Sequence, residues 1–535
     1  MYLYKSAHFL VPPRGGIINM KKTLSIQTPY SDAVANIALD TINKKKQALV
    51  FVNSKRGAEA QAERISLKIK EMKNSWHELS ESSLKALPKP TRQCERLSRC
   101  LSKGIAFHHS GLHKKQRELV ENAFRKGTIG IICATPTLAL GMNLPSFRTI
   151  VRDLKRYGPG GYNPIPVLEY MQFIGRSGRP DFNDKYGEAV TIAETDGQKE
   201  SIVEKYIKGD PEEIYSKLAL EPVLRMYMLT LIASEFCTTK KSLLKFFEKT
   251  FYGHQYGNIK GLKKIIDKIL FLLEDWEFIK PGDDFISANQ KADDKLEATP
   301  IGKRVSELYL DPYTAHILIL GMRKATKKAN TFSYLNLLTN CLEMRPLLNV
   351  KVSEYDEVEQ KTVEQPILVQ EPDQYDDSYE IFLKTIKTAM FLESWIEEKT
   401  EEYLLEAYGI RPGEIFIKLE RCDWLIYAST EIARIQQFAG VRMELYKLRQ
   451  RLKYGVKEEL LTLLKLKNIG RVRSRMLFKN GIKTIEDVKK ADYPILAQLL
   501  GKQIALDVKK QVGQDFSKVK VKPRKRKGQK NLKDY

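Results

Sequence analysis

Long apolar runs and paired cysteines are both missing from this sequence of 535 residues. No run approaches the about 20 apolar residues that span a bilayer, and the apolar stretch near the start is too short for a secretory signal. The six cysteines form no C-x-x-C pair, so neither a disulfide framework nor a zinc or iron–sulfur site is expected. We therefore expect a soluble protein that makes no use of a membrane and resides in a reducing compartment, the cytoplasm.

Two motifs that hold nucleoside triphosphates in many proteins are missing as well. The sequence contains no G-x-x-x-x-G-K-[ST] and no D-E-x-H or D-E-A-D. The first of these cradles phosphates with backbone amides and a lysine, and the second supplies a carboxylate for Mg²⁺. We therefore expect that this chain by itself does not bind ATP in the usual way.

Positive charge, in contrast, is abundant. Lys and Arg number 90 against 66 Asp and Glu, which gives a formal net charge of +24. A field of this sign raises the local concentration of polyanions and speeds their capture. Nucleic acid is therefore the first partner to consider, and a merely basic soluble protein is the alternative.

The first part of the chain alternates short apolar runs with helical stretches, which predicts a parallel sheet with crossover helices. Strands are expected over 47–52, 129–134, 148–153 and 189–193, and helices over 31–43 and 116–125. The stretch 71–90, rich in Ser, Lys and Pro, is interpreted as an inserted helix and loop. Residues 1–22 show no periodic pattern, so their structure stays open.

Leu-rich helical segments replace this alternation from about residue 210, at 223–236, 240–250 and 262–274. A short hairpin expected over 278–288 completes a pattern typical of a winged helix. The block 314–454 is expected to be helical apart from a solvated acidic loop at 353–379. The fold class is α/β plus mostly α, with domains expected at 1–22, 23–205, 206–320, 321–455, 456–513 and 514–535.

Four stretches of the first block carry the functional signal: ALVFVNSKRGAE (48–59), GIAFHHSGL (104–112), CATPTLALGMNLP (133–145) and QFIGRSGRP (172–180). With a fifth, YGEAV (186–190), they resemble in order and spacing the motifs of the second RecA-like lobe of Ski2-type superfamily 2 helicases. Nearly everything after residue 22 resembles the archaeal Ski2-like DNA helicases, relatives of HELQ and of the helicase part of DNA polymerase theta.

This resemblance implies a second RecA-like lobe followed by a winged helix, a helical ratchet-like bundle and a helix-hairpin-helix. It also implies a motor that uses ATP and Mg²⁺ to move along single-stranded and forked DNA. The cofactors would be held mainly by a first RecA-like lobe, which the sequence does not show.

Cations for the transition state are expected in QFIGRSGRP. Phosphoryl transfer needs cations against the charge that develops on the γ-phosphate, and the planar fork of arginine suits that role. Arg176 and Arg179, three residues apart on one expected helical face, are the candidates. Gly175 and Gly178 allow close approach, and Gln172 lies one turn earlier to position water or phosphate. The alternative is a basic turn before a proline.

Contacts to the nucleic-acid backbone are expected after two strands. The resemblance implies that Thr135 touches a phosphate, and that Gly141 and Asn143 couple this contact to bound nucleotide. A second phosphate is expected on the three residues after the preceding strand, Asn53, Ser54 and Lys55. Two such contacts on one lobe are what a stepping motor needs.

Three histidines at positions 108, 109 and 113 raise the question of a metal site. His109 and His113 have i, i+4 spacing, but no third or fourth ligand of suitable type lies nearby in the sequence. A structural role is therefore expected instead of a metal site, with Gly111 allowing the backbone to approach nucleic acid.

A hairpin is expected between the last two motifs, where two apolar segments flank four residues rich in Gly at 158–161. In the helicases that this sequence resembles, a hairpin here wedges the duplex apart. Tyr157 and Tyr162 are then expected to stack on the first separated base pair. An ordinary surface loop is the alternative.

One helix, at 413–434, places an aromatic residue opposite its expected buried stripe. That stripe contains Ile415, Leu419, Cys422, Ile426 and Ala433. Trp424 lies about 180° away, so we predict that Trp424 stacks on a base while Arg421 holds a phosphate. The family's basic residue seven positions before this Trp is Ile417 here, which leaves Lys418 or Arg421 as its substitute. A helix buried on both sides is the alternative.

The stretch 463–488 has the pattern of a helix-hairpin-helix: an apolar helix, a tight turn at Gly470, and a second helix that ends at Asn480 and Gly481. Free amides of such a turn and the dipole of the next helix favour a phosphate. Arg471 and Arg473 add positive charge, so a sequence-independent grip on the DNA backbone is expected. The basic residues 524–527 extend this grip or form a solvated end.

Several readings stay open. The missing first lobe is explained by a truncated gene, by a separate chain that supplies the lobe, or by a remnant that only binds nucleic acid. A Ski2-like RNA helicase is the alternative within the class, and the DNA-type C-terminal hairpin argues against it. The retained Arg176 favours an enzyme, because a pure binding protein has no use for an arginine directed at a nucleotide.

Overall fold

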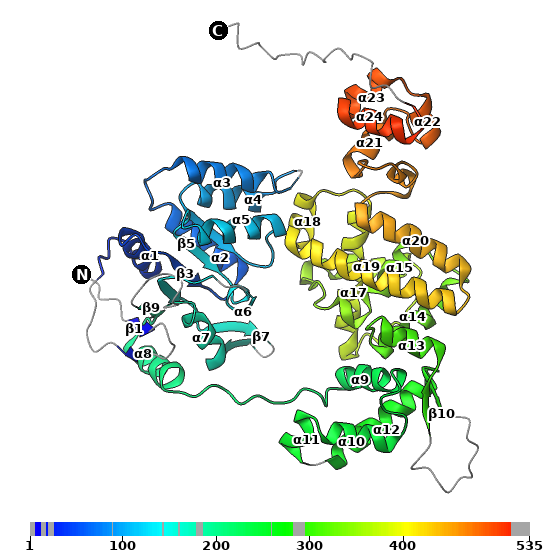
Figure 1. Ribbon diagram of the computed structural model, residues 1–535, viewed down its shortest axis with the longest axis horizontal. Helices are drawn as coiled ribbons and strands as arrows, with labels where there is room; N and C mark the ends of the chain where they lie inside the picture. Colours follow the sequence, from blue (N-terminus) through cyan, green and yellow to red (C-terminus); the bar gives the residue numbers. More distant parts are fainter. Residues whose placement is uncertain are drawn as a thin grey trace. The chain divides into compact units, whose positions relative to one another are not determined.

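The computed structural model describes residues 6–11, 18–19, 26–87, 89–141, 144–158, 161–177, 186–257, 259–281 and 295–514. The chain divides into two compact units, and Figure 1 shows most of the first in blue to cyan and most of the second in green to red. The first contains Met1–Ile214 with Gly409–Phe416, and the second contains Tyr215–Tyr408 with Ile417–Tyr535.

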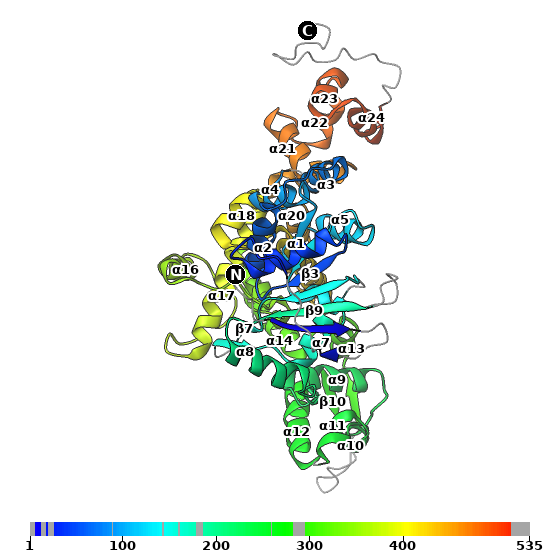
Figure 2. The same ribbon diagram turned by 90° about the vertical axis from the view of Figure 1, so that its left-hand side faces the viewer.

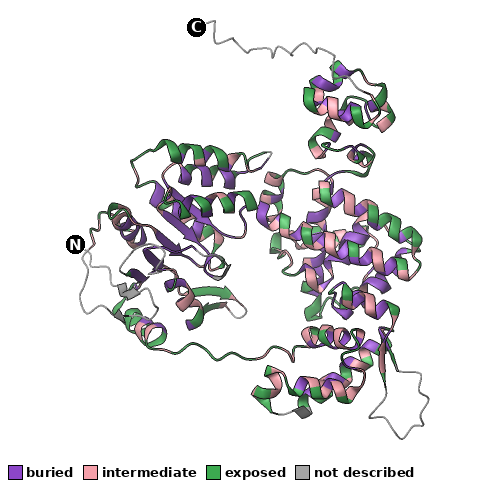
Figure 3. Ribbon diagram, viewed as in Figure 1, coloured by how far each residue is buried: buried purple, intermediate pink, exposed green. Residues whose placement is uncertain are grey.

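Seven strands form one sheet in the first unit. Their spatial order is β2 (Ile18–Asn19), β1 (Ser6–Val11), β9 (Gly187–Ile192), β6 (Arg148–Val151), β3 (Ala48–Phe51), β5 (Ile131–Ala134) and β4 (Ile105–His108). The five from β9 to β4 are parallel, whereas β1 runs antiparallel to β9 and β2 to β1. Strands β3 to β6 are buried along their whole length (Figure 3), as expected for a parallel sheet covered on both faces.

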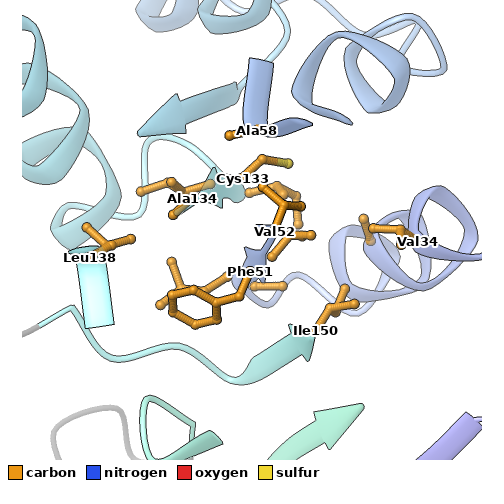
Figure 4. Packing of buried hydrophobic residues seen from close by; sticks show 14 of the residues in the cluster. Val34, Phe51, Val52, Ala58, Cys133, Ala134, Leu138 and Ile150 are labelled. Atoms are coloured by element: carbon orange, nitrogen blue, oxygen red, sulfur yellow. The ribbon is translucent and has the colours of Figure 1, made fainter. Parts of the chain in front are cut away.

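The helices of the first unit follow the strands as crossovers. They are α1 (Ala33–Asn43), α2 (Lys55–Ser66), α3 (Asn74–Leu84), α4 (Arg92–Leu101), α5 (Lys114–Arg125), α6 (Thr137–Gly141), α7 (Val167–Ile174) and α8 (Asp196–Ile202), continued by a π-helical turn, Val203–Ile207. Side-chain caps begin several of them, such as Asp32 at α1. Figure 4 shows the apolar core around β3, where Phe51 stacks on Phe173 with ring centroids 4.5 Å apart.

The predicted α/β pattern is confirmed for the four expected strands and for the inserted helix, which is α3. Strand β4 was not predicted, because its last residue, His108, and the next residue, His109, interrupt the apolar run after three residues. The predicted antiparallel hairpin is also confirmed, as β7 (Lys155–Gly158) paired with β8 (Gly161–Pro164). Pairing of β1 with β9 fills part of the region 1–22 that the sequence left open.

The second unit begins with α9 (Glu221–Ala233), α10 (Lys240–Glu248), α11 (Phe251–Tyr256) and α12 (Ile259–Asp275). An antiparallel pair follows, β10 (Ile279–Pro281) with β11 (Leu296–Ala298). The expected range of 278–288 is therefore wrong for the second strand, which lies about ten residues further on. The winged-helix interpretation stays a prediction.

Helices dominate the next part of the second unit: α13 (Pro300–Glu307), α14 (Pro312–Ala325), α15 (Thr331–Thr339), α16 (Tyr355–Glu364), α17 (Asp377–Ile396), α18 (Glu401–Tyr408), α19 (Pro412–Ile435) and α20 (Ala439–Tyr454). The first turn of α19 belongs to the first unit. The expected acidic loop at 353–379 is wrong in part, because α16 occupies its first half. This helix forms because Val358 is buried and Lys361 pairs with Glu393 at 3.0 Å.

The C-terminal helices form a small cluster in both views (Figures 1 and 2). They are α21 (Arg471–Lys479), α22 (Ile485–Lys490), α23 (Tyr493–Leu500) and α24 (Lys502–Gln511), around their own apolar core. The apolar helix expected before the Gly470 turn is wrong, since two 3-10 turns, Glu458–Leu460 and Leu463–Lys465, stand there. Helix α21 ends before Asn480 and Gly481, as predicted. The basic residues 524–527 lie outside the described residues.

Candidate functional site

The carboxyl ends of the parallel strands bring several predicted residues to one edge of the sheet. Asn53 follows β3, Thr135 follows β5 and Asp153 follows β6. The backbone N–H of Asn53 donates to Asp153 Oδ2 at 2.9 Å, and its side-chain amide donates to the Lys155 carbonyl at 3.1 Å. Ligands of open α/β sheets bind at this edge, so the predicted motifs lie where the fold favours a site.

Two of the expected phosphate contacts serve local structure in this arrangement. The Ser54 hydroxyl accepts the Gly57 N–H at 3.0 Å and caps α2, of which Lys55 is the first residue. Thr135 is buried, and its hydroxyl lies 3.0 Å from that of Thr137. Their contact with a phosphate stays a prediction.

Arg176 lies beyond a helix end. Helix α7 stops at Ile174, so the expected helical face shared by Arg176 and Arg179 is wrong at Arg176, which lies in the turn after the Gly175 cap. The guanidinium of Arg176 donates to the carbonyl of Ala139 in α6, which joins the arginine motif to the helix that ends at Gly141. Gln172 is half-buried on α7.

A Cβ at Gly175 would lie 3.0 Å from the Met171 carbonyl, so the helix end leaves little room for a side chain. Three predicted residues of these motifs lie outside the described residues: Asn143, Gly178 and Arg179.

A buried ionic network lies beside this edge, and sequence reasoning missed it. Glu59 accepts from His109 Nε2 at 3.1 Å and from Gln93 at 2.9 Å, and it pairs with Arg96. Burial alone would raise the pKa of Glu59, but these hydrogen bonds outweigh it and lower the pKa to about 2. The sequence signal that could have indicated this network is the spacing of Glu59, which lies four residues after Lys55 within the first motif and so one helical turn further along α2.

His109 positions the Gly111 turn. Its Nδ1 accepts the Gly111 N–H at 3.1 Å, so Nε2 carries the proton that Glu59 accepts. Burial lowers the pKa of His109 despite the nearby carboxylate. His108 bonds to Glu121 at 2.8 Å. Among the described residues no group of three or more His, Cys, Asp or Glu is placed to hold a metal ion.

The hairpin presents its aromatic residues to solvent. Tyr157 and Tyr162 are directly opposite each other in the β7–β8 register, with ring centroids 5.7 Å apart. Their exposed fractions are 77% and 68%. Neither ring is needed for a core, so both are available to stack on a base.

Helix α19 is buried on more of its surface than the expected stripe. Leu425, Ala428 and Ser429 are buried in addition, whereas Leu419 is only half-buried. Trp424 is half-buried, and its indole N–H donates to the Leu308 carbonyl at 3.1 Å. The alternative of a helix covered on two sides therefore describes α19 better.

The two cations near Trp424 are also bound to backbone. Lys418 is 6% exposed, and its ammonium donates to the carbonyls of Met344 and Pro346. This burial corrects the expectation that Lys418 presents its charge to nucleic acid. The guanidinium of Arg421 donates to the Arg345 carbonyl near the surface, so Arg421 stays the candidate partner of Trp424.

The turn at Gly470 precedes α21 as expected. Arg471 donates to the Lys399 carbonyl at 2.7 Å and lies over the Trp395 ring, 4.9 Å from its centroid. Arg473 is exposed and donates to the Asn468 carbonyl at 2.9 Å. Of the two arginines, Arg473 is therefore the one placed to meet a ligand.

The cation set of the first unit fits part of a nucleotide site. An arginine, a glutamine and a tight glycine turn suit the γ-phosphate of ATP. The described residues bring no group of carboxylates together for Mg²⁺. Binding of a triphosphate by these residues stays a prediction. No described helix has the length and apolar character to cross a membrane.

Two families match parts of this chain. Residues 31–181 match the helicase conserved C-terminal domain, and residues 332–455 match domain 4 of archaeal helicases. The parallel sheet with its motif edge and the helical unit that follows thus place the chain in the class of helicases.

Relatives over most of the chain define the family within that class. An ATP-dependent DNA helicase Hel308 from Methanococcus vannielii is 38% identical over 529 residues, covering 90% of this chain and 68% of the relative. The Hel308 of Pyrococcus horikoshii is 36% identical over 501 residues, covering 91% of this chain and 67% of the relative. The chain belongs to the family of the ATP-dependent DNA helicases Hel308. It spans about two thirds of the length of these relatives.

Proposed function

We propose that this chain is the DNA-gripping, arginine-bearing part of an ATP-dependent helicase that moves along single-stranded DNA and unwinds duplexes. The relatives are ATP-dependent DNA helicases by name. Hydrolysis then requires a further RecA-like lobe with a phosphate-binding loop, either in the same polypeptide or in a separate chain. A nucleic-acid-binding remnant without hydrolysis is the competing function.

One observation carries the proposal: a single sheet edge holds the strand-end motifs, the arginine turn and the exposed hairpin. Arg176 contacts the backbone of α6, the helix that follows Thr135. If nucleotide binding moves Arg176, α6 moves with it, and so does the predicted phosphate contact at Thr135. Such a direct connection is what coupling of hydrolysis to stepping needs.

Arginine is the group that this chain would supply to catalysis. In phosphoryl transfer an arginine directed at the transition state contributes about 10³-fold to 10⁵-fold in rate. We expect Arg176 and Arg179 to meet the charge on the γ-phosphate, with Gln172 holding the attacking water. The phosphate-binding loop and the Mg²⁺ ligands belong to the other lobe.

A phosphate-release assay with single-stranded DNA tests this proposal. This chain alone should show no DNA-stimulated hydrolysis, and addition of a RecA-like lobe with a phosphate-binding loop should restore turnover. Arg179→Ala should then lower the rate on the order of 10³-fold. Arg125→Ala is the matched control, since this exposed arginine on α5 donates to its helix neighbour Asn122 at 2.9 Å.

Two results would contradict the proposal. Hydrolysis by this chain alone would show that the added RecA-like lobe is not needed, and restored turnover indifferent to Arg179 would remove its catalytic role. Repeating the assay with RNA separates a DNA motor from an RNA motor. Stimulation by RNA alone would favour the RNA helicase instead.

A further inference from the structure

The β7–β8 hairpin has two chemically different faces. Residues opposite each other in an antiparallel pair share a face, and the faces alternate along each strand. Arg156 and Asn163 therefore lie on one face, where Arg156 pairs with Glu169 of α7 at 2.9 Å. The other face carries Lys155, Tyr157, Tyr162 and Pro164. One face is thus held against the lobe, and the basic and aromatic face is left for a ligand.

A pocket of about 640 Å³ lies at the base of this second face. Lys155, Tyr162 and Pro164 line it, whereas Arg156 and Asn163 do not. Its other walls come from the strand ends and from the segment after β9, and include Asn53, Asp153, Thr195, Gln198, Lys205 and Tyr206. Small-molecule sites have volumes of about 300–1,000 Å³, so one nucleotide fits this space.

The walls of the pocket are firmly placed. Tyr206 is buried, its hydroxyl donates to the Ile165 carbonyl at 2.9 Å, and its ring lies 5.0 Å from that of Tyr170. The π-helical turn Val203–Ile207 sets Tyr206 inward while Lys205 stays exposed beside the pocket. Such turns are frequent at functional sites.

The charges of the lining favour a phosphate. Asp153 is matched by Arg152 at 2.6 Å and by the Asn53 N–H, so its repulsion of an anion is offset. Lys155 and Lys205 then supply positive charge on two sides of the pocket. Glu194 is the lining carboxylate that opposes them. An aromatic ring with two lysines is the combination that binds single-stranded nucleic acid.

We propose that this pocket takes one nucleotide of a single strand that leaves the hairpin, with its base on Tyr162 and its phosphate between Lys155 and Lys205. The proposal rests on the proposed function in so far as DNA must reach the hairpin. It adds a site beyond the motifs, formed by α8 and the π-helical turn. The strand is either arm of a fork, because both carry the same chemistry.

Binding titrations of the full chain with forked DNA test this site. Lys205→Ala should weaken binding about five-fold at 0.1 M salt, because one lost single-strand phosphate contact lowers the slope of log affinity against log salt by about 0.7. Glu194→Gln should strengthen binding by about two-fold, since it removes a repulsive charge. Lys199→Ala is the matched control, because Lys199 is exposed on α8 but does not line the pocket.

Forks that lack one arm identify the strand. If the Lys205→Ala defect persists only with the 3′ arm or only with the 5′ arm, that arm enters the pocket. A fluorescent base analogue beside the junction on that arm should be quenched by Tyr162, and Tyr162→Phe should retain the quenching.

If Lys205→Ala and Lys199→Ala bind forked DNA with equal affinity, and Glu194→Gln binds it with the affinity of the unsubstituted chain, the proposal of a nucleotide site in this pocket is overturned. The proposed function survives that result, because it is read from hydrolysis and from Arg179. Failure of the unsubstituted chain to bind any fork would overturn both proposals.

Discussion

Two regions of this molecule carry similar side chains, yet they use them differently. The hairpin of the first unit exposes Tyr157 and Tyr162 at 77% and 68%. Helix α19 of the second unit has its Trp424 N–H on the Leu308 carbonyl and its Lys418 ammonium on two further carbonyls. Aromatic side chains are thus exposed to solvent in one region, whereas in the other an aromatic and a cationic side chain are hydrogen-bonded to the backbone of the fold.

The difference lies in what each sequence pattern determines. Strand register fixes both the direction of a side chain and its neighbour across the pair, so the tyrosine pair follows from the hairpin. A helical wheel fixes only the direction. Whether another segment covers that side of the helix depends on distant residues, here 308 and 344–346.

The largest effect is expected from Lys418→Ala in α19. Loss of this buried ammonium leaves two carbonyls without their donor, and hydrogen bonds to charged groups contribute about 1.5–3 kcal/mol each. We expect the free energy of unfolding to fall by about 3 kcal/mol or more. Denaturant unfolding of the full chain measures it.

Arg434→Ala is the control for that experiment, since Arg434 lies on the same helix with half of its side chain exposed and pairs locally with Glu431 at 3.2 Å. Its effect should stay within about 0.5 kcal/mol. A weaker grip on single-stranded DNA for Lys418→Ala, at unchanged stability, would instead restore Lys418 as a ligand contact.

Acid should destabilise the first unit through Glu59 and His109. The pKa of Glu59 is lowered from its ordinary 4.5 to about 2, so the unfolded chain binds the proton first and stability falls as pH drops from about 4.5 towards 2. The lowered pKa of His109 adds a loss that begins near its ordinary value of 6.5. Thermal melts at several pH values follow both losses.

Glu59→Gln isolates the carboxylate. This variant should be less stable at pH 7 and should lose less further stability below pH 4.5. Glu95→Gln, an exposed change on α4, should follow the unsubstituted chain. Parallel curves for Glu59→Gln and the unsubstituted chain would show that the buried network does not set the acid response.

Much of the first unit was predictable, because strands buried on both faces and motifs at their ends are local patterns. The Glu59–His109 contact was not, since it joins segments about 50 residues apart. In the second unit α16 was missed. The acidic residues at 356, 357 and 359 predict a solvated segment, whereas the helix forms with Val358 as the buried residue of its inner face. Composition predicts solvent exposure there but not the absence of a helix.

Substitutions of Trp424 in α19 and of Tyr157 in the hairpin compare the effect of an aromatic ring on stability and on DNA binding in the two regions. Trp424→Phe keeps a ring but loses the donor to Leu308, so stability should fall by about 1 kcal/mol while single-strand affinity holds. Trp424→Ala should weaken binding by about 1–3 kcal/mol if the ring stacks on a base. Tyr157→Ala should show the binding loss without a change in melting temperature. Unchanged affinity for Trp424→Ala would make its role purely structural.

The smallest effect separates two arginines of α21 that differ in their partners. Arg475 donates to Glu398 at 2.7 and 2.8 Å and pairs with Glu459 at 2.6 Å, so its charge is matched within the fold. Arg473 is exposed and donates to the Asn468 carbonyl instead of to a carboxylate. On duplex DNA, Arg473→Gln should therefore reduce the slope of log affinity against log salt by about 0.9, the contribution of one phosphate contact.

Arg475→Gln should leave that slope unchanged and lower the melting temperature instead, because it breaks a bidentate pair that joins α21 to the end of α17. Titrations at four or more salt concentrations, with melts of each variant, distinguish the two outcomes. Equal slopes for Arg473→Gln and the unsubstituted chain would place the DNA grip of the C-terminal helices elsewhere. A reduced slope for Arg475→Gln would mean that Arg475 leaves its carboxylate partners and contacts a phosphate when DNA binds. An ion pair within the fold would then not exclude a side chain from DNA binding.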